Sequence, residues 1–284
     1  MNKKKTAIVL EGGGMRGAYT SGALSWLIDN NIEFDNGYGI STGAVHLCNF
    51  LMKKQKDLHD FAVYHIANKK IVGILPFIRS LRIVDYYYLF RDYLPNELKF
   101  DISPLKDVKC QGKVGVYECE KGRTEFVPVQ DLHLHELQAA TTLPLIGKIV
   151  KMNENRHLLD GGITEMIPVN EAIKDGCTKQ LIIATKPKDY VRKPAKKIVA
   201  KIMKLVYPKW LSIGDDYEIR HLNYQKQIKL INELEENKSA LYISPSKHSK
   251  VTRLGGTVEQ LEELFQLGYS DMEAHKEEIL KLLK

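Results

Sequence analysis

This sequence is poor in cysteine, lacks long apolar runs and has no widespread charge excess, and each lack excludes a class of protein. Its 284 residues include four cysteines, with no CxxC pair and no metal-like spacing to histidine. The four are Cys48, Cys110, Cys119 and Cys177. We therefore expect reduced, mostly buried thiols, and neither a disulfide framework nor a metal site.

No apolar run is long enough for a membrane span. The run Thr6–Leu10 near the N-terminus is too short for a signal-peptide core and lacks a small-residue cleavage site. The later run from Ile71 to Ile78 falls far below the roughly 18 residues that a transmembrane helix needs. We expect a cytoplasmic protein that at most associates peripherally with the inner face of a membrane.

Positive charge is concentrated in one segment. The chain has 42 Lys and Arg against 35 Asp and Glu. Nine of these basic residues and a single acid lie between Lys186 and Lys209, which leaves 33 basic and 34 acidic residues elsewhere. Because the excess is local, the composition predicts no nucleic-acid partner.

Strand and helix patterns alternate in the first part of the chain. We expect, in order, a strand at 6–10, a helix at 17–29, a short extended segment at 34–40, a helix at 42–53, a hairpin of strands 113–119 and 124–129, a helix capped by Asp131 that ends before Pro144, and a strand at 181–185. This order favours a parallel sheet covered on both faces.

The composition changes after Lys186. A basic amphipathic helix at 195–207, a charged helix at about 215–236, a strand at 240–244 and terminal helices from Thr257 are expected. We place a boundary near residue 188, with a catalytic domain at 1–188 and a mostly helical extension at 189–284 that is not expected to fold alone.

The first chemical motif is Gly12-Gly13-Gly14-Met15-Arg16-Gly17, at the junction of a strand and a helix. Only glycines let backbone N–H groups converge there, beside the positive end of the helix dipole, so the turn suits an anion. The anion could be a dinucleotide pyrophosphate or the oxyanion of an acyl-transfer intermediate. This motif alone slightly favours the dinucleotide.

The second motif, Gly39-Ile40-Ser41-Thr42-Gly43, has the strand-to-helix context of a nucleophile elbow. In a dinucleotide-binding fold the second strand would instead end in an acid that holds the ribose, for which Asp35 is a candidate. The serine turn occupies that place, and the cofactor interpretation leaves it unexplained.

The third motif is Asp160-Gly161-Gly162, which follows the apolar pair Leu158-Leu159. An aspartate at this position can be partly desolvated and has room beside it for another side chain. A simple β-turn aspartate is the alternative, and it is the better interpretation of the tripeptide in isolation.

Together and in this order, the three motifs resemble those of the patatin-like phospholipase family. The resemblance covers about residues 6 to 186, and the segment from Ala139 to Pro144 is also similar to one that precedes the family's last sheet region. It implies a three-layer α/β/α fold with a mainly parallel central sheet. The mostly helical extension is similar to that of some bacterial members.

The resemblance also assigns roles to residues. It makes Ser41 the nucleophile, Asp160 its base, and the backbone of Gly12, Gly13 and Gly14 the oxyanion hole, with Arg16 in support. Gly39 and Gly43 then flank the elbow, and Gly161 and Gly162 complete the aspartate motif. Glu11 stands where the family often has Asp, and we expect that position to be structural.

A conventional triad is the competing arrangement, with His221 or His248 after Ser41 and Asp160 in the order of α/β-hydrolases. In that fold several strands normally precede the elbow, whereas one clear strand precedes it here. We therefore expect a Ser41/Asp160 dyad, with His46 and His157 as packed or hydrogen-bonded side chains.

A dyad requires Asp160 to take the Ser41 proton, so desolvation must make this carboxylate more basic. The expected reaction is hydrolysis of a carboxylic ester, of phospholipids or lysophospholipids, through an acyl-enzyme and without metal or cofactor. An NAD(P)-binding oxidoreductase and a non-catalytic membrane-binding protein on a hydrolase scaffold remain alternatives. The sequence predicts neither head group nor oligomeric state.

Two segments are candidates for lipid contact. The helix expected at 195–207 has an apolar side and a lysine-rich side, as suits an anionic bilayer, although a packed surface helix with solvated lysines is equally compatible. The segment from Ile71 to Phe90 suggests an acyl-binding cap, but buried packing is the preferred interpretation.

Overall fold

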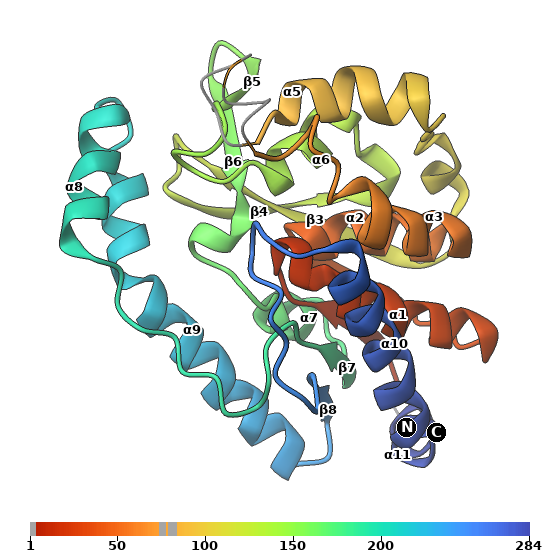
Figure 1. Ribbon diagram of the computed structural model, residues 1–284. Coiled ribbons are helices and arrows are strands. Elements are labelled where there is room, and N and C mark those ends of the chain that lie inside the picture. The colour runs from red at the N-terminus through yellow and green to blue at the C-terminus, as the bar shows by residue number, and fades with distance from the viewer. Residues whose placement is uncertain (1–3, 74–77, 79–83) are drawn as a thin grey trace.

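The computed structural model describes residues 4–73, 78 and 84–284. Within them the chain forms an eight-stranded mixed sheet with helices on both faces (Figure 1). The strands are β1 (Thr6–Leu10), β2 (Asn36–Ile40), β3 (Gln111–Glu118), β4 (Arg123–Pro128), β5 (Val150–Asn153), β6 (Arg156–Asp160), β7 (Lys179–Ile183) and β8 (Ala240–Ile243). The pairs β1–β2, β1–β7, β2–β3 and β7–β8 are parallel.

Helices cover the sheet in two layers. Packed on one face are α1 (Gly17–Asp29), α2 (Thr42–Leu51), α3 (Gln55–Asp60), α6 (Leu134–Thr141), α10 (Val258–Ala274) and α11 (Lys276–Leu283). On the other are α7 (Val169–Lys174), α8 (Lys197–Val206) and α9 (Ser212–Glu236). The other helical segments are α5 (Tyr86–Tyr88), the 3₁₀ turns η1 (Gly14–Arg16), η4 (Ser103–Asp107), η5 (Val129–Asp131) and η6 (Gly161–Ile163), and the π-helices η2 (Phe61–His65) and η3 (Leu89–Glu97).

The alternation of side chains along β1 builds both layers from one strand. Ile8 and Leu10 pack in the core beneath α1 and α10, whereas Ala7 and Val9 pack in the core on the side of α7 and α9. A strand buried on both faces reads as a continuous apolar run, as this one does. The expected α/β/α architecture with its helical C-terminal region is therefore confirmed.

Most expected elements are present, and one expected cap is wrong. The hairpin forms as antiparallel β3 and β4. Asp131 does not cap the next helix, because it ends the turn η5 and helix α6 starts later, after His133, without a side-chain cap. The sequence could not locate this start because a short 3₁₀ turn precedes the helix.

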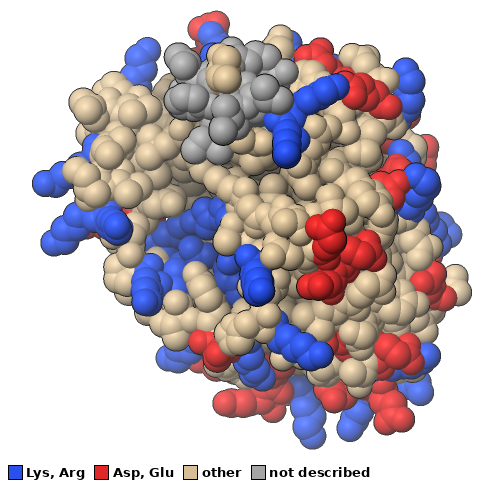
Figure 2. Space-filling model, viewed as in Figure 1, with Lys and Arg blue, Asp and Glu red and all other residues tan. Residues whose placement is uncertain are grey.

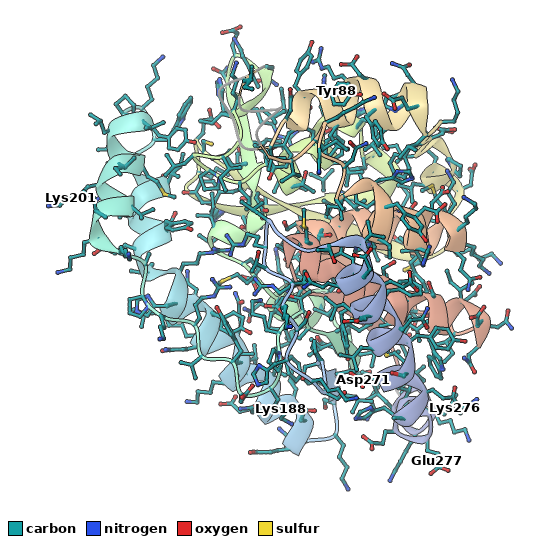
Figure 3. The ribbon with its side chains drawn as sticks, viewed as in Figure 1. Tyr88, Lys188, Lys201, Asp271, Lys276 and Glu277 are labelled. Atoms are coloured by element: carbon teal, nitrogen blue, oxygen red, sulfur yellow. The ribbon has the colours of Figure 1, made fainter. Side chains whose placement is uncertain are left out.

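The C-terminal region is joined to the sheet and to the first helix. Strand β8 extends the sheet in parallel beside β7. Helix α10, on which Figure 3 labels Asp271, packs closely on α1. Tyr19 on α1 donates a hydrogen bond to Asp271 at 2.9 Å. The capping box of Thr257 and Gln260 sets the start of α10. The division near residue 188 stays a prediction.

No helix in the described part of the chain combines the length and the apolar character needed to cross a lipid bilayer.

Candidate active site

Ser41 stands on a strained turn between β2 and α2. Its backbone has φ 57° and ψ −126°, a conformation that is costly for any residue with a side chain. A Cβ on Gly39 would lie 2.6 Å from the Gly43 carbonyl oxygen, and one on Gly43 would lie 2.8 Å from that of Leu10. Both flanking glycines are therefore needed for the chain to turn this sharply beside β1.

The register of the sheet brings Asp160 to this turn. Strand β4 occupies one edge of β3 from Lys113 to Glu118, so β2 and β6 must share the other edge. On that edge Ile40 pairs with Gly115, and Asp160 pairs with the next residue, Val116. The C-terminal ends of β2 and β6 therefore meet, which carries Ser41 and Asp160 into one cavity.

Asp160 is almost fully buried, with 2% of its surface exposed. Its Oδ1 accepts a hydrogen bond from the Gly162 N–H at 2.7 Å, whereas its Oδ2 has no hydrogen-bond partner among the described residues. Burial raises the pKa of Asp160, although the nearby Ser41 hydroxyl, the Gly162 N–H and the charge of Arg220 act in the opposite direction. A carboxylate with one free oxygen and a raised pKa can accept a proton.

The glycine turn offers two backbone donors to the same cavity. The Gly12 N–H donates to the Met166 carbonyl at 3.2 Å, and the Met15 N–H donates to the Arg253 carbonyl at 3.0 Å. Within the described residues, the N–H groups of Gly13 and Gly14 between them have no protein acceptor. All three glycines line the cavity, and two of them have a donor left for an oxyanion.

Glu11, immediately before the glycines, is fully buried and forms an ion pair with Lys186. It also accepts hydrogen bonds from the backbone and hydroxyl of Thr185 at 2.7 and 3.0 Å. Burial tends to raise the pKa of Glu11, but Lys186 and Thr185 outweigh it and hold this pKa below its usual value. These contacts tie the end of β1 to the end of β7 beneath the glycine turn.

Arg16 lies outside the cavity that Ser41 lines. It borders a neighbouring pocket with Lys186 and Tyr190, and its Nε is buried without a partner in the described chain. Its side chain therefore borders a different pocket from Ser41, and support of the oxyanion hole by Arg16 stays a prediction.

The cavity has an apolar wall and a basic wall. The apolar wall comes from α2, η2 and the segments on either side of residues 74–83: Val45, Phe61, Ile66, Ile71, Val72, Val84, Tyr86, Leu89 and Phe90. The segment suggested as a cap thus contributes to the cavity at its two ends, while residues 74–77 and 79–83 lie outside the described chain. The basic wall comes from Arg220 on α9 and Arg253 before α10.

No histidine borders the cavity in the described chain. His221 contacts the Glu218 carbonyl at 3.1 Å, and His248 forms an exposed ion pair with Asp189 at 3.2 Å. His46 is buried in α2, and burial lowers its pKa to about 4. His157 lies 2.6 Å from the Glu120 carboxylate. Neither triad candidate stands beside Ser41 and Asp160.

Asp35 stands at the wrong end of β2 to hold a ribose. It precedes Asn36 at the start of the strand and accepts hydrogen bonds from Thr6 at 2.8 Å. A ribose-binding acid should follow the strand, on the same edge as the glycine turn. The structure has Ser41 at that edge.

A comparison with protein families identifies the chain. The description "Patatin-like phospholipase" applies to residues 8–173, which include the glycine turn, the elbow and the Asp160 motif. The chain belongs to the patatin-like phospholipase family. A second match, at residues 212–284, is to a domain of unknown function, DUF6363.

Two known proteins are similar over much of the chain. An uncharacterized protein of Escherichia coli K12, YjjU, is 25% identical over 189 residues, which are 64% of this chain and 52% of that protein. The crystal structure of VipD from Legionella pneumophila gives a TM-score of 0.54 at 13% identity, over 95% of this chain and 66% of that one. The chain thus spans about half of the first relative, and its likeness to VipD is one of fold.

Two residues that line the cavity of this patatin-like protein could not be recognised as site residues from the sequence. Arg220 lies in a long charged helix and Arg253 in a polar loop, and both are within the DUF6363 match. No motif surrounds them, and packing of the C-terminal region against the patatin-like part brings them to Ser41. A lone arginine in such segments is usually solvated, so sequence reasoning had no reason to select them.

Proposed function

We propose that this protein is a serine lipid acyl hydrolase that cleaves carboxylic esters through Ser41 and Asp160. The observation that carries the proposal is one cavity containing a serine on a strained elbow, a buried aspartate with a free oxygen, and two unpaired backbone donors. Family membership supports ester hydrolysis, and the apolar wall supports an acyl chain.

The proposed reaction begins with transfer of the Ser41 proton to the free Oδ2 of Asp160. Ser41 Oγ attacks the ester carbonyl, and the N–H groups of Gly13 and Gly14 stabilise the oxyanion. The alcohol leaves with the proton from Asp160, which leaves an acyl-enzyme. Asp160 then accepts a proton from water as the resulting hydroxide attacks the acyl group. It passes this proton to Ser41 Oγ as the bond between Ser41 and the acyl carbon breaks, which releases the fatty acid and restores both residues.

Labelling with a fluorophosphonate tests the nucleophile. Wild type should be labelled and should hydrolyse a soluble short-chain ester, whereas Ser41→Ala should do neither. Asp160→Asn should also lose most hydrolysis, and the double variant should be little worse, because the two residues act as a unit. An unlabelled but folded wild type would favour the non-catalytic alternative, and thermal stabilisation by a nicotinamide dinucleotide would favour the oxidoreductase.

We also propose that α8 docks the enzyme on an anionic membrane. Ala200 and Met203 attach the helix to α9, whereas Ile198 and Leu205 are 59% and 80% exposed. Lys201 points away from the protein body (Figure 3). Exposed apolar side chains beside lysines are expected of a helix that lies in a bilayer interface, where each lysine contributes about 1 kcal/mol.

Co-sedimentation with anionic vesicles tests this docking. Lys204 pairs with Asp215 at 2.5 Å, so the informative variant replaces Lys196, Lys197 and Lys201 with Gln. It should bind less than wild type at low salt, and both should release at high salt, because surface charges are screened over about 8 Å at physiological ionic strength.

The matched control removes the same charge elsewhere. Lys106, Lys226 and Lys281 are exposed lysines on other helical segments that form no ion pair within the described residues, and their replacement with Gln should leave binding intact. If both triple variants lose vesicle binding equally, the net charge of the protein and not the position of the α8 lysines accounts for the binding. If wild type and the α8 variant sediment equally with the vesicles, the proposal that α8 docks on the membrane is wrong.

A further inference from the structure

Two arginines border the Ser41 cavity, and the one carboxylate that lines the cavity with them, within the described residues, is Asp160. The arginines that form ion pairs within the described chain are Arg123 and Arg156, both elsewhere. Arg220 and Arg253, which line the cavity, have none. Figure 2 shows Lys and Arg side chains gathered in a hollow beside α8 and α9.

Arg220 is a buried cation held in a fixed position. Only 9% of its surface is exposed, and its Nε donates a hydrogen bond to the Gly162 carbonyl. Gly162 is the residue whose N–H binds Asp160. The guanidinium thus lies directly behind the aspartate motif, with its remaining N–H groups available to the cavity.

Arg253 lines the same cavity beside the glycine turn. Its carbonyl accepts the Met15 N–H, and a Cβ on Gly14 would lie 2.7 Å from its Cγ. The side chain therefore starts directly over the glycine turn. Arg220 and Arg253 come from different segments of the chain. Arg220 lies beside the Asp160 motif and Arg253 beside the glycine turn, and both line the cavity.

These cations repel one another. Burial, together with the charges of Arg253 and Arg192, lowers the pKa of Arg220 to about 9, although Tyr217 and Asp160 act in the opposite direction. Asp160 offsets part of this charge, whereas Glu11 is paired with Lys186. One carboxylate does not balance two guanidinium groups, and holding the excess positive charge around buried Arg220 is costly unless a further anion joins them.

We propose that Arg220 and Arg253 form a phosphate subsite of the Ser41 cavity, which selects acyl esters that carry a phosphate close to the ester bond. The inference rests on the proposed hydrolase function and assigns recognition of the substrate phosphate to two named side chains. Guanidinium groups match phosphate oxygens with paired hydrogen bonds, and the apolar wall across the cavity suits the acyl chain. The subsite gives the DUF6363 region a role in substrate recognition.

A matched substrate pair tests the subsite in the full-length protein. A lysophosphatidate and the monoacylglycerol with the same acyl chain differ in the phosphate alone. Wild type should prefer the lysophosphatidate in kcat/KM. Arg253→Gln should lower kcat/KM for the lysophosphatidate roughly 10- to 100-fold more than for the monoacylglycerol, as expected for a lost hydrogen bond to a charged group.

Arg220 needs a conservative variant, because its bond to Gly162 also supports the fold. Arg220→Lys keeps the charge and should retain more lysophosphatidate activity than Arg220→Gln, if the latter folds. Arg123→Gln, an exposed arginine paired with Glu125, is the control and should change neither rate. Equal losses on both substrates in the Arg253 variant would make these arginines structural and overturn the subsite.

Inorganic phosphate distinguishes a head-group site from a site for the free ion. It should competitively inhibit monoacylglycerol hydrolysis by wild type, and about tenfold more should be needed in Arg253→Gln. Inhibition without any preference between the two esters would mean that the site binds free phosphate, which overturns the assignment to substrate.

Failure of the proposed function would look different, since wild type would then hydrolyse neither ester. Thermal stabilisation by phosphate, compared between wild type and Arg253→Gln, would in that case decide the subsite by itself. Stabilisation confined to wild type would support an anion site, and none in either protein would refute it.

Discussion

Replacing Glu165 with Gln should stabilise the protein above neutral pH and have no effect in acid. Glu165 follows the Asp160 motif, where its N–H donates to the Gly161 carbonyl at 3.0 Å. The side chain is half-buried, and its carboxylate accepts a hydrogen bond from Asn170 at 3.3 Å and interacts with Gln227. Burial and the nearby charge of Glu171 raise the pKa of Glu165 from 4.5 to about 7.

The sign and size of the effect follow from this raised pKa. Between about pH 4.5 and 7 the folded state holds a proton that the unfolded state has lost, so the free energy of unfolding falls as the pH rises through that window. Each pKa unit corresponds to about 1.4 kcal/mol, so the full loss is about 3 kcal/mol. Glu165→Gln keeps the size of the side chain and removes this loss.

Urea unfolding at several pH values is the assay. At about pH 8.5 the variant should exceed wild type by about 3 kcal/mol, and near pH 4 the two should agree. Glu154→Gln is the control, because that side chain is 86% exposed, and it should change stability by less than about 0.5 kcal/mol. A gain that is the same at every pH, or absent at high pH, would refute the reasoning.

Three further predictions concern the glycines and histidines. Gly13→Ala would bring a methyl group 2.7 Å from Thr185 Cγ2 and should lower kcat about 100-fold or more in a protein that still folds; an unchanged kcat would return the turn to a structural role. Gly268→Ala would set a Cβ 2.0 Å from the Tyr19 carbonyl and should cost about 1–3 kcal/mol in urea unfolding, whereas Ser270→Ala, exposed on the same helix, should cost almost nothing. Replacing His221 or His248 with Gln should leave most ester hydrolysis intact, and a collapse of activity in either would revive the triad.

The sequence by itself determined which local elements form and which residues carry chemistry. The apolar run Thr6–Leu10 predicted a buried strand, and glycine spacing predicted both turns, because these depend on local sterics and burial pattern. The wrong prediction at Asp131 also came from a local signal in the sequence. It relied on a local capping signal, and an intervening 3₁₀ turn displaced the helix start.

Tertiary structure decided how those pieces meet. The order of strands along the two edges of β3 brings Ser41 and Asp160 together although they are separated by most of the patatin-like region, and pairing of distant strands leaves no signature in a single sequence. Likewise, Arg220 and Arg253 border the cavity because the C-terminal helices pack on the sheet. The burial of Arg220, and the position of Arg253 beside the glycine turn, depend on long-range packing that neither segment specifies alone.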